Sequence, residues 1–392
     1  MYTQNTPIHM NLWHRGFWML VLSNMLLSMS VYMLIPILPM WIMGDLHQSP
    51  LATGVAMGIY GVGVFLLGGF CSYLIQRFRR NRVCSWAVAA MMACTAVLWL
   101  LRNTDFVACE MWMVWAVRLL VGATFGLADM VLASTLVIDQ CESFQRTEAN
   151  YVASWFRRFA LSLGPMLSLV VYRASDFDSV LLLSMATAFL SIVLIRMVNF
   201  PFKAPEDTMK LVSLDRFFLP QAWPMFLNLL MVSVLFGMIM SVEWTERFYA
   251  MMMAGFLLAL VAQKFVFVNA ELKSEAICGM LSLAAALILM ITQGTAAVDY
   301  LSPVLVGFGV GMIGSRFLLF FIKLSDHCQR GTSQSTFFLC WELGMALGLF
   351  VGYAVLWKQP RVLLLSGLAL VTVALAFYHF VIHQWYLKHK NR

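Results

Sequence analysis

Six charged residues stand inside long apolar runs of this chain: Arg118, Asp129, Arg157, Arg158, Arg316 and Glu342. A charge at bilayer depth costs roughly 2.5–3.5 kcal/mol even on the lenient insertion scale, so it is retained where it faces a cavity or a partner. A carboxyl group alternates between its protonated and ionised forms if its hydration and its Arg partner change. The two acids, Glu342 first and Asp129 second, are therefore candidates for proton coupling.

Helix depth suggests a partner for each acid. At 1.5 Å per residue, Asp129 lies roughly 12 Å above the cytoplasmic end of its helix, and Arg157 and Arg158 lie roughly 14–16 Å above the start of the next helix. Arg316 and Glu342 stand at similar depths on two later helices. We therefore predict two buried ion pairs, Asp129 with Arg157 or Arg158, and Arg316 with Glu342. Static structural pairs are the alternative.

The remaining charge, Arg118, lies three turns before Asp129 on the same helix face, about 16 Å away and out of contact. Four Arg against two acids leave the interior formally positive by two. A positive cavity favours anionic or amphipathic solutes over lone cations.

The elements that hold these charges are membrane helices. Hydrophobic residues make up 61% of the 392 residues and charged residues 11%, which leaves no polar coat for a soluble domain. Helices are the open segments that satisfy their own backbone in lipid, and each needs roughly 20 apolar residues. We predict an all-α polytopic membrane protein with twelve transmembrane helices, at 17–43, 51–76, 83–101, 109–137, 148–172, 179–198, 224–242, 248–268, 276–294, 301–323, 333–356 and 362–386.

Basic residues indicate the topology. Most of the 26 Lys and Arg fall in alternate connections and in the termini, as the positive-inside rule requires. The net charge of +7 therefore reports topology and not nucleic-acid binding. We expect a multi-pass protein of a bacterial-type inner (plasma) membrane with both termini cytoplasmic. Its expected partners are the lipid bilayer and a small-molecule substrate, without nucleic acid, and it is expected to be a monomer.

Metal and cofactor motifs are missing from the sequence. The eight Cys are scattered without CxxC spacing, and the seven His lie mostly in tails and loops. Disulfides and zinc are therefore not expected. We expect no cofactor, no metal and no enzymatic activity, with a proton gradient as the energy source.

The chain divides nearly in half at a polar stretch. We predict a six-helix bundle at 1–198, a cytoplasmic linker at 199–223 and a second six-helix bundle at 224–392. Two sets of anchors recur at nearly the same spacing in the two halves: Gly122 and Gly126 correspond to Gly307 and Gly311, and Arg146 and Gly164 correspond to Arg330 and Gly348. Parallel six-helix repeats with a mid-membrane site between them are a known transporter architecture.

Four short motifs occur at defined helices. The loop after the second helix reads Gln76-Arg77-Phe78-Arg79-Arg80-Asn81-Arg82, the fourth helix carries Arg118-x-x-x-Gly122, the fifth carries Gly164-Pro165, and the loop between the tenth and eleventh reads Arg330-Gly331-Thr332. With these motifs the chain resembles the major facilitator superfamily of secondary transporters over essentially its whole length. Pro36-Ile37-Leu38-Pro39 in the first helix is similar to its drug-efflux branches.

The resemblance assigns roles to several motif positions: Gln76, Arg77, Arg80, Gly122, Gly164 and Pro165. It implies a gate-locking loop after the second helix, a proton-transfer or structural role for Arg118, and an antiporter-associated motif at Gly164-Pro165. Gln76 stands where the family has an acid, so the lock is expected to be weaker or built otherwise.

Polar and aromatic residues on the cavity-type helices predict the substrate cavity: Asn24, Tyr32, Tyr60, Phe125, Trp155, Asn228 and Trp341. Aromatic walls with sparse polar groups suit a flat or lipophilic ligand. Lipid-facing or core packing is the alternative for each of these residues taken singly.

The leading hypothesis is export of a small organic (lipophilic or anionic) compound by alternating access, through proton antiport. Its rival is uptake of a small nutrient such as a sugar or organic acid by proton symport. Gly164-Pro165 and the few amides and acids in the cavity helices favour export. A membrane-embedded enzyme, a receptor or a channel is disfavoured, because no catalytic constellation, soluble output domain or pore-lining charge ring is found.

Overall fold

The computed structural model describes residues 11–103, 111–200, 210–292 and 296–391. This part of the chain is helical, without a β-strand. Eleven of its segments are long and apolar enough to cross a membrane: Arg15–Gly44, Pro50–Arg77, Arg80–Arg102, Met111–Asp139, Phe177–Met197, Pro220–Met240, Glu246–Phe265, Leu272–Thr292, Ala297–Leu324, Arg330–Ala354 and Pro360–His389. The 29-residue helix α8 (Arg146–Ala174), which carries Arg157 and Arg158, completes the predicted set. The predicted all-α polytopic fold is confirmed.

Some segments are single helices and others are interrupted. The uninterrupted ones are α5 (Arg80–Asn103), α8, α9 (Phe177–Met197), α10 (Trp223–Met240), α11 (Glu246–Phe265), α12 (Leu272–Thr292), α13 (Ala296–Leu324) and α14 (Arg330–Ala354). The interrupted ones are α1 (Arg15–Tyr32) with α2 (Leu34–Gly44), α3 (Pro50–Leu66) with α4 (Cys71–Arg77), α6 (Met111–Val131) with α7 (Val137–Asp139), and α15 (Pro360–Phe377) with α16 (His383–His389). Hydropathy predicts the segments but not these interruptions.

Two of the interruptions have a local cause or signature. Pro36 lacks the N–H that would bond to the carbonyl of Tyr32, so the helix breaks at Met33, between α1 and α2. Between α6 and α7 a π-helical turn runs over Leu132–Leu136, and such turns frequently mark functional sites. Tyr32 therefore ends α1, and Asp129 lies just before the π turn.

Capping residues fix the starts of two helices. Ser49 accepts a hydrogen bond from the backbone N–H of Ala52 at 3.2 Å, ahead of Pro50 at the first position of α3. Asp176 accepts one from the N–H of Ser179 at 2.8 Å and so caps α9. This hydrogen bond holds the pKa of the Asp176 carboxyl below its usual value. Both caps follow the preference for Ser and Asp at helix N-termini.

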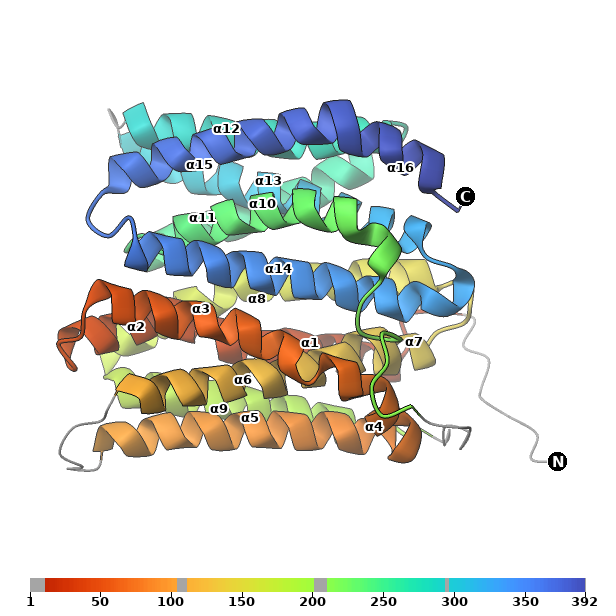
Figure 1. The fold of residues 1–392 in the computed structure, drawn as a ribbon, viewed down its shortest axis with the longest axis horizontal. Helices are drawn as coiled ribbons and strands as arrows, with labels where there is room; N and C mark the ends of the chain where they lie inside the picture. The colour runs from red at the N-terminus through yellow and green to blue at the C-terminus, as the bar shows by residue number, and fades with distance from the viewer. Residues whose placement is uncertain (1–10, 104–110, 201–209, 293–295, 392) are drawn as a thin grey trace.

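The helices of each sequence half lie together. In Figure 1, α1 to α9 fill the lower part of the view and α10 to α16 the upper part, with α3 beside α14 between them. Helices α8 and α11 also contact each other across the halves. Large apolar side chains are exposed on the outer helix faces, as a lipid-facing surface requires, among them Val62, Trp86, Phe189, Leu258 and Phe380.

The repeated glycines occupy equivalent contacts in the two halves. Gly122 of α6 packs against the backbone of α3, and Gly307 of α13 packs against the backbone of α11, so both join the second and fourth helices of a half. Gly164 of α8 packs on the end of α1, and Gly348 of α14 packs on α10, which joins the first and fifth. The sequence anchors therefore mark the same positions in two similar bundles.

A glycine face brings the two halves into contact. A Cβ atom added at Gly54 of α3 would lie 2.7 Å from the Cβ of Ala354 in α14, and Gly58 and Gly61 face the same helix further along. Side chains at these positions would force the helices apart. Small residues thus allow α3 and α14 to approach closely within the bilayer.

The fold predicts that the two ends of α14 lie on opposite sides of the membrane. Cys328 is exposed just before the helix, and Lys358 is exposed just after it. Two variants of a cysteine-free protein test this, one that keeps only Cys328 and one that carries only Lys358→Cys. An impermeant maleimide added to sealed vesicles should label one of the two variants and leave the other unlabelled. Labelling of both from the same side would contradict the crossing.

Candidate functional site

The centre of the site is the carboxylate of Glu342 in α14. Its side chain is fully buried at 0% exposure. Tyr32 donates a hydrogen bond to Oε1 at 2.5 Å, and Tyr60 donates one to Oε2 at 3.1 Å. The acid belongs to the second half of the chain, and both donors belong to the first. Each carboxylate oxygen is therefore held across the boundary between the halves.

A guanidinium group joins Glu342 to the second buried acid. Nη1 of Arg157 donates to Oδ2 of Asp129 at 2.8 Å, and Nη2 lies 2.8 Å from Oδ1. The same Nη2 lies 3.9 Å from Oε1 of Glu342, and Nε donates to the Tyr32 hydroxyl at 3.4 Å. Of the two partners that the sequence left open for Asp129, the structure therefore selects Arg157. We name the group of Tyr32, Tyr60, Asp129, Arg157 and Glu342 the buried carboxylate network.

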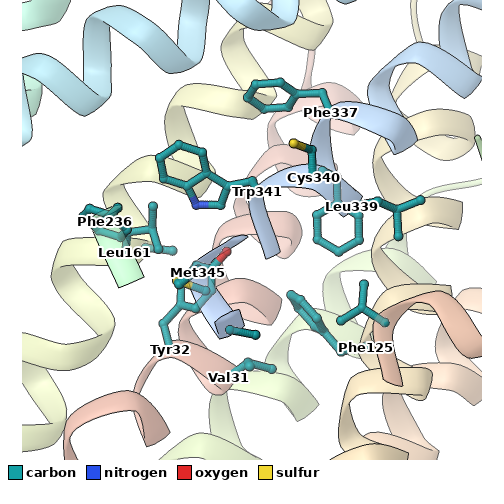
Figure 2. Close-up of a cluster of buried hydrophobic side chains, with 14 of the residues drawn as sticks. Val31, Tyr32, Phe125, Leu161, Phe236, Phe337, Leu339, Cys340, Trp341 and Met345 are labelled. Atoms are coloured by element: carbon teal, nitrogen blue, oxygen red, sulfur yellow. The ribbon is translucent and has the colours of Figure 1, made fainter. Parts of the chain in front are cut away.

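Aromatic rings pack around the buried carboxylate network. Phe125 of α6 lies 6.1 Å from the ring of Tyr60 and 5.8 Å from the ring of Phe338 on α14. The guanidinium of Arg157 stacks over Phe338 at 4.1 Å. Figure 2 shows Tyr32, Phe125 and Trp341 gathered around α14. Apolar walls exclude water and strengthen the charge interactions inside.

Arg118 extends the network toward α3. Its Nε donates to the carbonyl of Ala56 at 3.3 Å, and its guanidinium lies 4.9 Å from the ring centre of Tyr60. It is therefore placed to support the hydroxyl donor of Glu342 through the ring. The role that the family resemblance implies for Arg118 in proton transfer stays a prediction.

The predicted pair of Arg316 with Glu342 is wrong. Nε of Arg316 bonds to Glu275 of α12 instead, whose side chain is only 1% exposed. The sequence placed Glu275 in a cytoplasmic loop, but α12 begins at Leu272, so this acid lies in the first helical turn and is buried. Four Arg thus face three acids, and the predicted positive surplus of two falls to one.

The other predicted cavity residues are dispersed. Asn228 donates to the carbonyl of Ala374 at 2.9 Å, which directs it to α15 within its own half. Trp341 packs on Phe236 of α10 at 5.5 Å. Asn24 is buried in α1, where its Oδ1 has no hydrogen-bond partner among the described residues. Trp155 and Arg158 form a separate cluster against α13. The structure therefore brings Tyr32, Tyr60 and Phe125 to Glu342, but not these residues.

The motif positions after the second helix make contacts within the first half. Arg80 pairs with Asp139 of α7 at 2.5 Å. Gln76 donates to the hydroxyl of Ser72 at 3.3 Å, and Arg77 donates to the hydroxyl of Tyr73. The loop thus fastens helix ends on the predicted cytoplasmic side.

The linker supplies a contact that the sequence did not reveal. The N–H of Arg216 donates to Thr332 of α14 at 2.8 Å, and its side chain donates to Thr135 of the π turn at 3.1 Å. Asp215 accepts from Ser72 at 3.4 Å and from Thr332 at 3.3 Å. Asp215 and Arg216 therefore tie the two halves together next to Gln76. An isolated Asp-Arg pair in a polar linker carries no periodic signal that predicts such a role.

The comparisons with known proteins agree with this architecture. The family model of the Major Facilitator Superfamily matches residues 20–349, so the chain belongs to that superfamily. It is thus a multi-pass membrane transporter and not an enzyme. No curated protein sequence matches it significantly.

Three solved structures show the likeness of fold. The human organic anion transporter MFSD10 (TETRAN) has a TM-score of 0.67 at 15% identity, over 93% of this chain and 98% of that one. A mutant of the nucleoside transporter NupG has a TM-score of 0.66 at 12% identity, over 93% and 100%. The POT family transporter PepTSo has a TM-score of 0.69 at 11% identity, over 96% and 98%. At these identities the likeness concerns the fold alone.

Asp129→Asn is expected to lower thermal stability markedly. Removing one partner of a buried pair leaves the other charge uncompensated, which typically costs about 3–5 kcal/mol. The matched control is Glu246→Gln, because its pair with Arg173 is largely exposed and such pairs contribute about 1 kcal/mol or less. The measurement is the thermal unfolding midpoint in detergent. Equal midpoints for the two variants would contradict the assignment of Asp129 and Arg157 as a buried pair.

Proposed function

We propose that this protein is a proton-coupled exporter of a small organic (lipophilic or anionic) compound. We place it in a drug-efflux-like branch, in a bacterial-type inner membrane, with both termini in the cytoplasm. The observation that carries the proposal is Glu342, a fully buried carboxylate of the second half whose donors, Tyr32 and Tyr60, belong to the first. The hydrogen bonds of a carboxylate in that position depend both on its protonation and on the distance between the halves.

The proposed mechanism is alternating access, in which 1–198 rocks against 224–392. Ionised Glu342 holds the halves together through Tyr32, Tyr60 and Arg157. Protonation removes the charge, so these contacts weaken and the halves separate. Asp129 and Arg157 are both in the first half and move together, which makes their pair a fixed support for the switch and not the switch itself.

The free energy that the contacts of Glu342 lose on protonation is large enough to drive a conformational switch. A hydrogen bond to a charged group is worth about 1.5–3 kcal/mol, roughly twice a neutral one, so protonation costs the two Tyr bonds about 2 kcal/mol together. The attraction of Arg157 across 3.9 Å adds about 4 kcal/mol at an effective dielectric constant of 20. The sum is similar to the ~5.5 kcal/mol that moves a two-state equilibrium from 1:99 to 99:1.

The direction of transport is supported by the position of Gly164-Pro165. A Cβ atom at Gly164 would lie 3.2 Å from the Cβ of Tyr32 and 3.2 Å from the carbonyl oxygen of Met29. The antiporter-associated motif thus packs directly on the residue that donates to Glu342. This contact connects the antiporter-associated motif of the fifth helix to Glu342 through Tyr32.

Glu342→Gln is expected to abolish proton-coupled transport, because the amide keeps the shape of the side chain but carries no ionisable proton. The matched control is Glu275→Gln, an equally buried acid that pairs within its own half and should retain coupling. The measurement is internal pH in proteoliposomes during solute addition under an imposed pH gradient. Unchanged proton movement in Glu342→Gln would refute the role of this acid.

The same assay decides the direction. Proton movement opposite to the solute supports export by antiport, and movement in the same direction identifies an uptake symporter. Transport without proton movement leaves a facilitator in which the buried charges are structural.

Cross-linking α3 to α14 should stop transport if the halves must separate there. The Cβ positions at Gly54 and Ala354 lie close enough for Gly54→Cys and Ala354→Cys to be bridged after a small shift. Oxidation should reduce the uptake rate of inside-out vesicles to background, and a reducing agent should restore it. Full activity of the cross-linked protein would show that this contact does not open.

A further inference from the structure

Arg158 is a buried cation that has no acidic partner among the residues that the structure describes. It follows Arg157 in α8 but lies against α13, where a Cβ atom at Gly314 would overlap its guanidinium. The residue is 5% exposed. Its Nη1 donates to the hydroxyl of Ser154 at 3.3 Å, and its guanidinium lies 4.9 Å from the ring centre of Trp155. Its Nη2 has no hydrogen-bond partner among the described residues.

Two of the other three buried Arg residues have an acidic partner, and Arg118 has none among the described residues. Arg157 has Asp129, and Arg316 has Glu275. Burying an uncompensated charge is expensive, so natural proteins keep one where a ligand or a function demands it. Nε1 of Trp155 is a second buried donor that lacks a partner in the described structure. Two donors on adjacent turns of α8, Nη2 of Arg158 and Nε1 of Trp155, are therefore available to an acceptor from a ligand.

A cavity lies close to this cluster, on the predicted cytoplasmic side. It measures about 350 Å³, lies between α8 and α13, and is lined in part by Tyr151, Ser315 and Arg316. The ring of Tyr151 meets that of Trp155 edge-on at 6.3 Å. Ser315 directly follows Gly314, on which Arg158 packs. Tyr151 and Ser315 thus line the cavity on one side and adjoin the cluster on the other, while Arg158 and Trp155 themselves do not line it.

The cavity lining suits an amphipathic ligand. Most of its walls are apolar, with Phe144, Leu318, Leu319 and Ile322 among the lining residues, and Glu148 is exposed at its cytoplasmic end. Arg316 is neutralised by Glu275. Of the two interior Arg residues that have no acidic partner among the described residues, Arg118 and Arg158, it is Arg158 that lies near this cavity.

We propose that Arg158 and Trp155 form the anion subsite of the transported compound. The ligand class is an aromatic organic anion. Its ring system occupies the cavity between α8 and α13, and its carboxylate or sulfonate accepts from Nη2 of Arg158 and Nε1 of Trp155 once the ring of Tyr151, which lines the cavity next to Trp155, turns aside. The inference rests on the proposed function, because it names the substrate class of that transporter.

Equilibrium dialysis in detergent, without any pH gradient, tests the subsite. The probes are 2-naphthoate and 2-naphthalenesulfonate, with 2-naphthamide and 2-naphthylmethylammonium as neutral and cationic matches. The wild-type protein should bind at least one of the acids at least tenfold more tightly than either match. Absence of saturable binding of both acids, or equal binding of the amide, would overturn the proposal.

Substitutions separate a ligand site from a structural role. Arg158→Met should weaken binding of the acid at least tenfold, Arg158→Lys should keep part of it, and the exposed control Arg82→Met should bind normally. Because Met removes an uncompensated buried charge, Arg158→Met should unfold at the same or a higher temperature than the wild type. Unchanged binding in Arg158→Met would overturn the assignment. So would a structural defect, in which Arg158→Met loses binding and has a lower unfolding midpoint, and Arg158→Lys recovers the midpoint without recovering binding.

Failure of the anion subsite and failure of proton coupling give different results. Binding is measured by dialysis without a pH gradient, and coupling is measured as proton movement in proteoliposomes, so the two claims are tested by separate assays. If the acid binds through Arg158 but moves without protons, the coupling mechanism is wrong and the subsite stands. If protons move but the acid does not bind, the subsite is wrong and the coupling stands.

Discussion

The structure depends on a carboxylate that is buried where the two halves of the chain meet. Glu342 comes from α14, and the groups that satisfy it come from α1, α3 and α8. A buried charge is stable only while its partners remain in place. Separation of the halves would remove all of these partners together, and loss of the charge would remove the reason for holding them. Our proposal therefore links protonation and movement at this one side chain.

The helix geometry around this carboxylate serves the same constraint. The break at Met33 leaves Tyr32 at the end of α1, and the π turn after Asp129 interrupts the helix that carries Arg157's partner. The glycine face of α3 brings α14 close enough for Tyr60 to reach Glu342. Irregular backbone at membrane depth is tolerated where it is covered by protein. The break at Met33 and the π turn over Leu132–Leu136 adjoin the network, whereas the π turn over Tyr378–Ile382 lies on a helix that exposes Phe380.

The sequence predicts the fold well because lipid imposes a single rule on every helix. Segment number, repeat anchors and the burial of Glu342 and Asp129 all follow from hydropathy and spacing. The partners are harder to predict, because a depth along a helix says nothing about which face a side chain occupies. Depth alone predicts a pair of Arg316 with Glu342, but Arg316 pairs with Glu275 instead. The predicted helix starts at 276, a few residues too late, and therefore leaves Glu275 in a loop. No sequence pattern predicts the contacts by which Asp215 and Arg216 join the two halves.

The most direct measurement of the central claim is the distance between the halves as a function of pH. Spin labels at Arg82→Cys on α5 and Ser274→Cys on α12, both exposed near the predicted cytoplasmic surface, report this distance by pulsed electron paramagnetic resonance. Our account predicts that the wild-type distance distribution shifts between two populations as the pH falls, and that Glu342→Gln stays in the separated population at every pH. A Glu342→Gln protein with the pH response of the wild type would contradict it.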